Sequence, residues 1–117
     1  MYINGFDSID DIFTQFDTSS EVLNNAHLLY AKYRSGYEGD AYILYSKDSK
    51  LFEVHGSHCS CYGLEGQWTP EEVFIQDLEF RFFQSKDLPY CCEDEIDINE
   101  LKQALLSHLA EHILLHN

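Results

Sequence analysis

Thiol and imidazole side chains gather in one short segment of the chain. His58, Cys59 and Cys61 lie within four residues of one another, and Cys91 and Cys92 follow thirty residues later. Thiolate and imidazole suit tetrahedral zinc, so the first three side chains could bind zinc with Cys91 or Cys92 as the fourth ligand. The spacing argues against this site, because structural zinc centres usually place two to four residues between paired cysteines. We therefore expect no cofactor, with zinc as the alternative.

The same segment raises the possibility of a cysteine nucleophile. Cys59 or Cys61 would be the thiolate, and His55 or His58 would accept its proton. Adjacent residues of an extended segment point to opposite faces, so His58 and Cys59 are poorly placed to react together. Ser-His-Asp signatures and phosphate-binding glycine loops are also missing from the sequence. We predict that the chain is not an enzyme, and we keep a zinc- or thiol-dependent protein centred on the loop from His58 to Cys61 as the alternative.

Three further histidines recur at four-residue spacing near the C-terminus. His108, His112 and His116 would share one face of a helix, which is a geometry that can bind metal. The HExxH pattern of metalloproteases is absent, because Glu111 directly precedes His112. Imidazoles near a helix C-terminus also interact well with the helix dipole, which favours a structural or surface role.

Charge is the most unusual property of the composition. The 117 residues contain 21 Asp and Glu against 7 Lys and Arg, giving a net charge of −14. This balance argues against direct binding to nucleic acid or to an anionic membrane, whose phosphates are bound by Lys and Arg. A protein with a basic surface is the natural complement.

The carboxylates are unevenly distributed along the sequence. Between Glu65 and Glu100 there are 11 of them, against only Arg81 and Lys86. A chain of this length should be about 35 Å across, and a DNA duplex presents about 20 phosphate charges over that distance. An acidic face that mimics DNA is therefore physically possible, and a solvated acidic surface explains the same composition.

Aromatic residues next to glycines provide candidate anchors for a partner protein. Tyr37, Tyr62 and Trp68 lie in such segments, and side chains of this kind often carry most of the binding energy of an interface. Together with nearby acidic residues they form the predicted partner-binding set: Tyr37, Glu38, Asp40, Tyr62, Glu65, Trp68, Glu71, Glu72, Glu93, Asp94 and Glu95.

The hydrophobic pattern predicts an α+β fold in a single domain spanning residues 1–117. Alternating and β-branched runs predict strands near residues 28–34, 41–45 and 51–55, joined as a three-stranded antiparallel meander. Capping residues and apolar spacing predict about four helices, beginning near Asp7, Thr18, Thr69 and Asp97, the last running to the C-terminus. No apolar stretch is long enough to cross a bilayer and no signal peptide precedes the domain, so we expect a cytoplasmic protein with reduced cysteines.

Two stretches of the sequence resemble a known group of proteins. They are the run from Gly36 to Ala41 and the string EVHGSHCSCYGLEGQW from Glu53 to Trp68. The span from Gly36 to Glu72, about a third of the chain, resembles a segment of small acidic proteins encoded by bacteriophages and prophages. The resemblance implies an intracellular protein made during infection of a bacterial cell, and it brings no catalytic residue with it.

Small acidic phage proteins often bind and disable host enzymes, which gives the leading hypothesis from the sequence. We expect a stoichiometric inhibitor of a host nucleic-acid-binding or defence enzyme, of the anti-CRISPR or anti-restriction type. It would present carboxylates to a basic groove as a DNA mimic, or dock its aromatic loop on a host protein such as a nuclease or CRISPR effector.

Overall fold

The computed structural model describes residues 1–116 of the chain, with side chains described through Glu111. Its centre is a five-stranded mixed sheet in the order β1-β2-β3-β4-β5. The predicted α+β class is confirmed, but the prediction of three strands and about four helices is wrong, since three α-helices accompany the five strands. The strands are β1 (Tyr2–Asn4), β2 (His27–Arg34), β3 (Gly39–Lys47), β4 (Lys50–His58) and β5 (Glu71–Val73).

The predicted meander forms the middle of this sheet. Strands β2, β3 and β4 pair antiparallel, with Ile43 opposite Ala31 on one side and Val54 on the other. A two-residue turn at Asp48 and Ser49, both with positive φ, connects β3 to β4. This is the backbone conformation that matches the twist of a tight hairpin. The additional strands lie at the edges, where β1 runs parallel to β2 and β5 runs antiparallel to β4.

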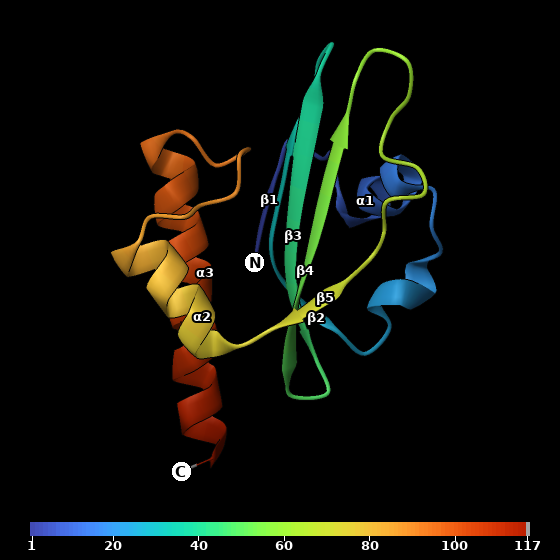
Figure 1. The fold of residues 1–117 in the computed structure, drawn as a ribbon. Coiled ribbons are helices and arrows are strands. Elements are labelled where there is room, and N and C mark those ends of the chain that lie inside the picture. Colours follow the sequence, from blue (N-terminus) through green and yellow to red (C-terminus); the bar gives the residue numbers. More distant parts are fainter. Residues whose placement is uncertain (117) are drawn as a thin grey trace.

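The helices cover both faces of the sheet, as Figure 1 shows. On one face lie α1 (Ile9–Phe16) and the 3₁₀ turn η1 (Ser20–Leu23), which belong to the crossover from β1 to β2. The opposite face carries α2 (Ile75–Glu79), the π-helical turn η2 (Phe80–Gln84) and the long helix α3 (Glu95–His116). Because side chains alternate along each strand, the two faces contribute to two separate cores.

Each core combines one sheet face with its covering helices. Ile12 and Phe16 of α1 pack with Ile43 and Val54 on the first face. On the second face, Leu101 and Leu105 of α3 pack with Leu78, Phe82 and the strand residues Tyr42 and Leu44. The apolar spacing that predicted the last helix is thus confirmed at Leu101 and Leu105, which are fully buried, while Ile113, which continues this spacing in the sequence, lies outside the described side chains.

The prediction of a helix beginning at Thr69 is wrong. Residues Glu71–Val73 form β5, which pairs with Leu51–Glu53, and α2 begins only at Ile75. The pattern Thr-Pro-Glu-Glu fits a helix start locally, but pairing with the open edge of β4 prevails. The short length of β5 agrees with Pro70, because proline is tolerated at the end of an edge strand.

Two other helix starts also differ from the sequence prediction. The segment after Thr18 makes only the 3₁₀ turn η1, capped by Ser19, and Asn25 with φ of 61° turns the chain into β2. Helix α3 begins before Asp97, because the Asp94 carboxylate accepts the Asp97 amide at 2.7 Å and caps the first turn. The start of α1 agrees with prediction, with Ser8 as its cap.

A buried ion pair joins the sheet to the second helical layer. Glu53 of β4 accepts hydrogen bonds from the Arg81 guanidinium at 2.8 and 3.0 Å and from the Tyr42 hydroxyl at 2.5 Å. His55 lies 3.8 Å from the same carboxylate. Burial opposes the charge on Glu53, but His55, Arg81 and Tyr42 outweigh burial and lower its pKa from 4.5 to about 2. The pair holds η2 in place against the sheet.

The molecule measures 49 × 31 × 22 Å along its principal axes. Within residues 1–116, no helix is long and apolar enough to cross a membrane.

Candidate protein-binding surface

Three connections meet at one end of the sheet, in the upper half of Figure 1. They are the β2–β3 loop, the loop after β4 and the segment that leads into α3. Gly39 pairs with His58, which brings the first two connections together. Arg34 at the end of β2 contacts Glu93 at 2.7 Å, which adds the third. A hollow of about 290 Å³ lies between them and is lined by Asp40, Ala41, His55, Gly56, Ser57, Gln67, Pro89, Tyr90 and Cys91.

Each of these connections carries an exposed tyrosine. Tyr37 is 79% exposed, Tyr62 is 55% exposed and Tyr90 is 84% exposed. Ile96 lies in the first turn of α3, six residues after Tyr90, and is 70% exposed. We call this part of the molecule the tyrosine end and define it by Tyr37, Glu38, Tyr62, Glu65, Tyr90 and residues 93–96. Three rigid amphipathic rings on neighbouring loops are the kind of side chain that forms energetic centres of protein interfaces.

The charged groups at the tyrosine end are mainly acidic. Glu38, Glu65, Asp94 and Glu95 are exposed. Arg34 is the cation that joins the connections, and hydrogen bonds from its guanidinium to Glu93 and Asp40 raise its pKa. Hydrogen bonds from the Gly63 and Glu65 amides lower the pKa of the Glu65 carboxyl, so it stays ionised at neutral pH. The tyrosine end therefore combines exposed aromatic rings with a negatively charged surrounding surface.

Local packing fixes the loop after β4 at its base. The His58 ring lies against Gly39, where an added Cβ would approach Nε2 to 2.5 Å. Burial raises the pKa of the Tyr33 phenol, so the Tyr33 hydroxyl stays protonated and donates to His58 Nε2 at 2.7 Å. His58 Nδ1 then donates to the Cys59 carbonyl at 3.0 Å. Both nitrogens of His58 are thus engaged, which leaves neither to act as a base for the thiols.

The Gln67 carboxamide pairs with the backbone of β4 at Ser57. It accepts the Ser57 amide at 2.8 Å and donates to the Ser57 carbonyl at 2.7 Å, as a neighbouring backbone would. Its amide group also donates to the Gly63 carbonyl at 3.0 Å. Leu64 is fully buried under Gly56, where an added Cβ would lie 2.9 Å from the leucine. Much of the segment from Glu53 to Trp68 therefore has a structural role in this chain.

Not all of the predicted partner-binding residues lie at the tyrosine end. Trp68 packs edge-on against Phe16 at 5.3 Å and stacks on Tyr45 at 6.0 Å, so its ring belongs largely to the first core. Glu71 and Glu72 are on β5, whose partners lie near the opposite tip of the hairpin. The members of the predicted set that lie on or beside the three connections are Tyr37, Glu38, Asp40, Tyr62, Glu65 and residues 93–95.

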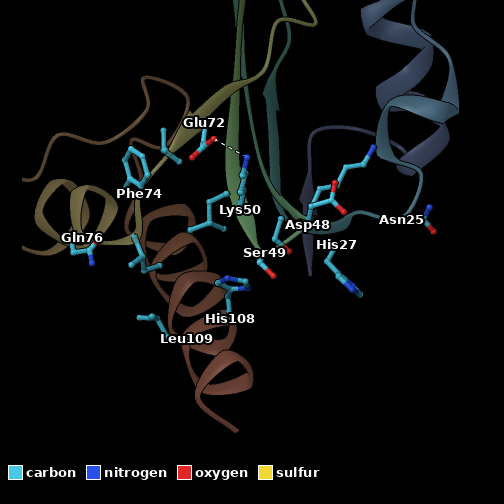
Figure 2. Close-up of a pocket in the computed structure, with 15 residues that line it drawn as sticks. Asn25, His27, Asp48, Ser49, Lys50, Glu72, Phe74, Gln76, His108 and Leu109 are labelled. Carbon is cyan, nitrogen blue, oxygen red and sulfur yellow. Dashed lines mark ion pairs between the residues drawn. The ribbon is translucent and has the colours of Figure 1, made fainter. Parts of the chain in front are cut away.

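A larger pocket of about 540 Å³ surrounds the opposite tip, where β3 turns into β4. Figure 2 shows Lys50 directed toward Glu72, with an ion-pair distance of 3.8 Å, and Phe74 on the same rim. Asp48 and Ser49 of the turn and His108 of α3 also line it. The pocket takes in Glu72 and none of the tyrosines, so Phe74, which is 61% exposed, is a suitable control position.

The cysteines are distributed over two sites. Cys59 and Cys61 lie on the accessible loop after β4, whereas Cys91 and Cys92 are buried in the second core. The Cys92 sulfur is 3.4 Å from the Tyr30 hydroxyl, and Cys91 approaches the Lys32 carbonyl at 3.9 Å. Hydrogen bonding to Cys92 and burial raise the pKa of the Cys91 thiol, which disfavours the thiolate that zinc requires.

The predicted zinc ligands are therefore not assembled. Among the described residues, no group of three or more His, Cys, Asp or Glu side chains is placed to bind a metal ion. The histidine series on α3 is tested only at His108, because His112 and His116 lie outside the described side chains.

Sequence reasoning missed Tyr90 and Ile96 as surface residues. Tyr37 and Tyr62 were recognised as surface residues because each stands next to a glycine. Tyr90 stands between Pro89 and Cys91, so this signal is missing. Ile96 precedes Asp97, where the sequence predicted the last helix to begin, so it was assigned to no face of that helix. Its exposure follows from the earlier start of α3, which turns Ile96 away from the Leu101 and Leu105 face.

Comparison of the chain with protein-family models, with curated proteins and with solved structures finds no match.

Proposed function

We propose that the chain acts by stoichiometric binding of its tyrosine end to a basic surface of another protein. The observation that supports this most directly is that three separate connections at one end of the sheet each carry an exposed tyrosine, with exposed carboxylates on the same connections. Aromatic anchors supply apolar contact area at low cost in side-chain entropy. The surrounding charge would steer a cationic partner and reject an acidic one.

The geometry favours docking by aromatic anchors over mimicry of a DNA duplex. A duplex carries about one phosphate charge per 1.7 Å, so the 49 Å length of the molecule corresponds to roughly 29 charges. The chain has 21 carboxyl side chains in total, and they are divided between the α1 side, as at Asp10 and Asp11, and the α3 side, as at Asp94 and Glu95. The carboxylates are thus fewer than the phosphates of a duplex of the same length, and they are not gathered on one face.

The biological context in this proposal rests on the phage resemblance. A protein of that kind would bind a host nuclease, CRISPR effector or other nucleic-acid-binding enzyme and block its basic groove. The partner's Lys and Arg would pair with Glu38, Glu65 and Glu95, while the tyrosines fill apolar pockets beside them. The chain itself would catalyse no reaction.

Affinity capture from bacterial lysate tests the proposal when matched variants are compared. The tyrosine-end variant combines Tyr37→Ala, Tyr62→Ala and Tyr90→Ala, and the control is Phe74→Ala at the opposite tip. We expect the control to retain a specific basic partner. The tyrosine-end variant should bind roughly 30-fold or more weakly, as expected for loss of at least one hot-spot residue of about 2 kcal/mol.

A charge variant with Glu38→Gln, Glu65→Gln and Glu95→Gln separates the long-range attraction by the carboxylates from the contact energy of the tyrosines. It should slow association at low salt and reduce the salt dependence of binding, because the partner is no longer attracted from a distance. Equal capture by the wild type and the tyrosine-end variant, with both folded, would exclude the proposed surface.

A further inference from the structure

The tip of the loop after β4 carries two thiols on a fixed base. The Ser57–Gln67 hydrogen bonds and the buried Leu64 side chain hold the two ends of the loop. Between these fixed points, Cys59 is partly exposed and Cys61 is exposed. Neither side chain contributes to either hydrophobic core.

The backbone doubles back at Ser60 and directs one cysteine toward the other. The Cys61 amide donates to the Cys59 sulfur at 3.5 Å. This hydrogen bond, together with a side-chain interaction with Cys61, lowers the pKa of the Cys59 thiol. The arrangement distinguishes the two residues, because the Cys59 sulfur accepts the hydrogen bond from the Cys61 amide and its thiolate form is thereby stabilised.

Other chemical roles for this pair have less support from the surrounding residues. Both ring nitrogens of His58 are engaged by Tyr33 and by the Cys59 carbonyl, and His55 lies beside Glu53 and Tyr42, so neither candidate imidazole is placed to activate the thiols as in a cysteine hydrolase. Cys91 and Cys92 are buried in the second core and cannot resolve an oxidised Cys59. Cys61 is the thiol positioned for that step.

We propose that Cys59 and Cys61 are a redox modification site that forms a reversible disulfide within the loop by exchange with low-molecular-weight disulfides. The Cys59 thiolate attacks one sulfur of the reagent, which breaks the reagent's S–S bond, forms a mixed disulfide and releases one thiolate. Cys61 loses its proton to solvent and attacks the Cys59 sulfur. The loop disulfide forms, and the second reagent thiolate leaves. Two protein thiols are oxidised and one disulfide is reduced to two thiols.

The site should belong to the labile class of disulfides. Residues separated by one position close a very small ring, and strained or exposed disulfides are more easily reduced than structural ones. Glu65 lies on the same loop, and the net charge of the chain is −14, so anionic reagents are repelled. A cationic disulfide such as cystamine should therefore react faster than the anionic glutathione disulfide at low salt.

The test uses the purified chain, cystamine and mass spectrometry of peptides after acid quenching. In the wild type, the peptide with Cys59 and Cys61 should lose two hydrogen atoms and regain them on reduction, while Cys91 and Cys92 remain thiols. Cys61→Ser should stop at a cysteamine adduct on Cys59. Cys59→Ser should form its adduct on Cys61 several-fold more slowly, because the stabilised thiolate is gone.

Two outcomes would overturn this proposal. One is accumulation of stable cysteamine adducts on both cysteines of the wild type without loss of the two hydrogens. The other is equal reaction rates in Cys59→Ser and Cys61→Ser. The measurement needs no partner protein, so its result is independent of the proposed binding function.

Discussion

Replacing Arg81 by methionine should expose the role of the buried Glu53 carboxylate. Glu53 is 4% exposed and accepts two hydrogen bonds from Arg81 and one from Tyr42. Arg81→Met keeps much of the length and apolar character of the side chain but removes both guanidinium donors. The variant leaves a charge in the second core whose remaining partners are the Tyr42 hydroxyl and His55 at 3.8 Å.

The pKa of Glu53 sets the size of the effect. Burial would raise this pKa, but His55, Arg81 and Tyr42 lower it from 4.5 to about 2. A tenfold change in proton affinity corresponds to about 1.4 kcal/mol, so the stabilised carboxylate contributes roughly 3 kcal/mol at neutral pH. This agrees with the loss of about 3–5 kcal/mol typical when one partner of a buried pair is removed.

The pH dependence has a definite sign. Because the folded-state pKa of Glu53 is depressed, its contribution in the wild type is fully present above pH 4.5 and is lost as the pH falls toward 2. In Arg81→Met, burial of Glu53 without the guanidinium raises the pKa of Glu53 above its wild-type value. Glu53 is therefore protonated at a higher pH in the variant, and its protonation removes the cost of the unpaired buried charge as the pH falls. The difference in the free energy of unfolding between the two proteins should therefore shrink on acidification.

Urea denaturation at constant ionic strength, followed by fluorescence of the single tryptophan, measures this difference between pH 7 and pH 3.5. Lys86→Met is the control, since it removes one exposed positive charge without breaking the buried pair. The reasoning is refuted if Arg81→Met loses less than about 1 kcal/mol at pH 7. It is also refuted if the loss is the same at both ends of the pH range.

Four further outcomes follow from the packing and the charge. Leu101→Ala should cost about 2–5 kcal/mol in urea denaturation, whereas Leu106→Ala, at an exposed position of the same helix, should cost little. Gly39→Ala should displace the His58 ring, because the added Cβ would lie 2.5 Å from His58 Nε2 and the Arg34 carbonyl, at 2.8 Å, closes the other side. The displacement would be seen as a changed His58 resonance in NMR spectra. Gln67→Ala should increase amide hydrogen exchange at Ser57, with no change expected at Ile43. The thermal midpoint should rise from low to moderate salt, since screening relieves the repulsion of a −14 chain, and an unchanged midpoint would contradict this.

The central meander and the last helix were predictable because their signals are local. Tight turn chemistry at Lys47–Lys50 and alternating residues define strands β3 and β4, and a long apolar repeat defines α3. The edge strands were not predictable in the same way. Three residues at Tyr2–Asn4 or Glu71–Val73 become strands only because a longer strand offers them a free edge.

The candidate site was predictable as a list of residue types but not as a place. Loop glycines identified Tyr37 and Tyr62 as surface aromatics, and both are exposed. That their two loops lie at the same end of the sheet as the segment with Tyr90 depends on the pairing of Gly39 with His58 and on the Arg34–Glu93 contact, which are long-range features. For the same reason the sequence left Cys91 or Cys92 open as a fourth ligand in the alternative zinc site, although the fold buries both in the second core.

Competition between the chain and nucleic acid for one purified basic partner tests the proposed function most directly. Fluorescence anisotropy of a labelled duplex bound to the partner would be followed while the chain is added. We expect wild type and Phe74→Ala to release the duplex at one equivalent, and the Tyr37→Ala, Tyr62→Ala, Tyr90→Ala variant to release it only at much higher concentration. Simultaneous binding of the chain and the duplex, or equal competition by the tyrosine-end variant, would contradict inhibition through the tyrosine end.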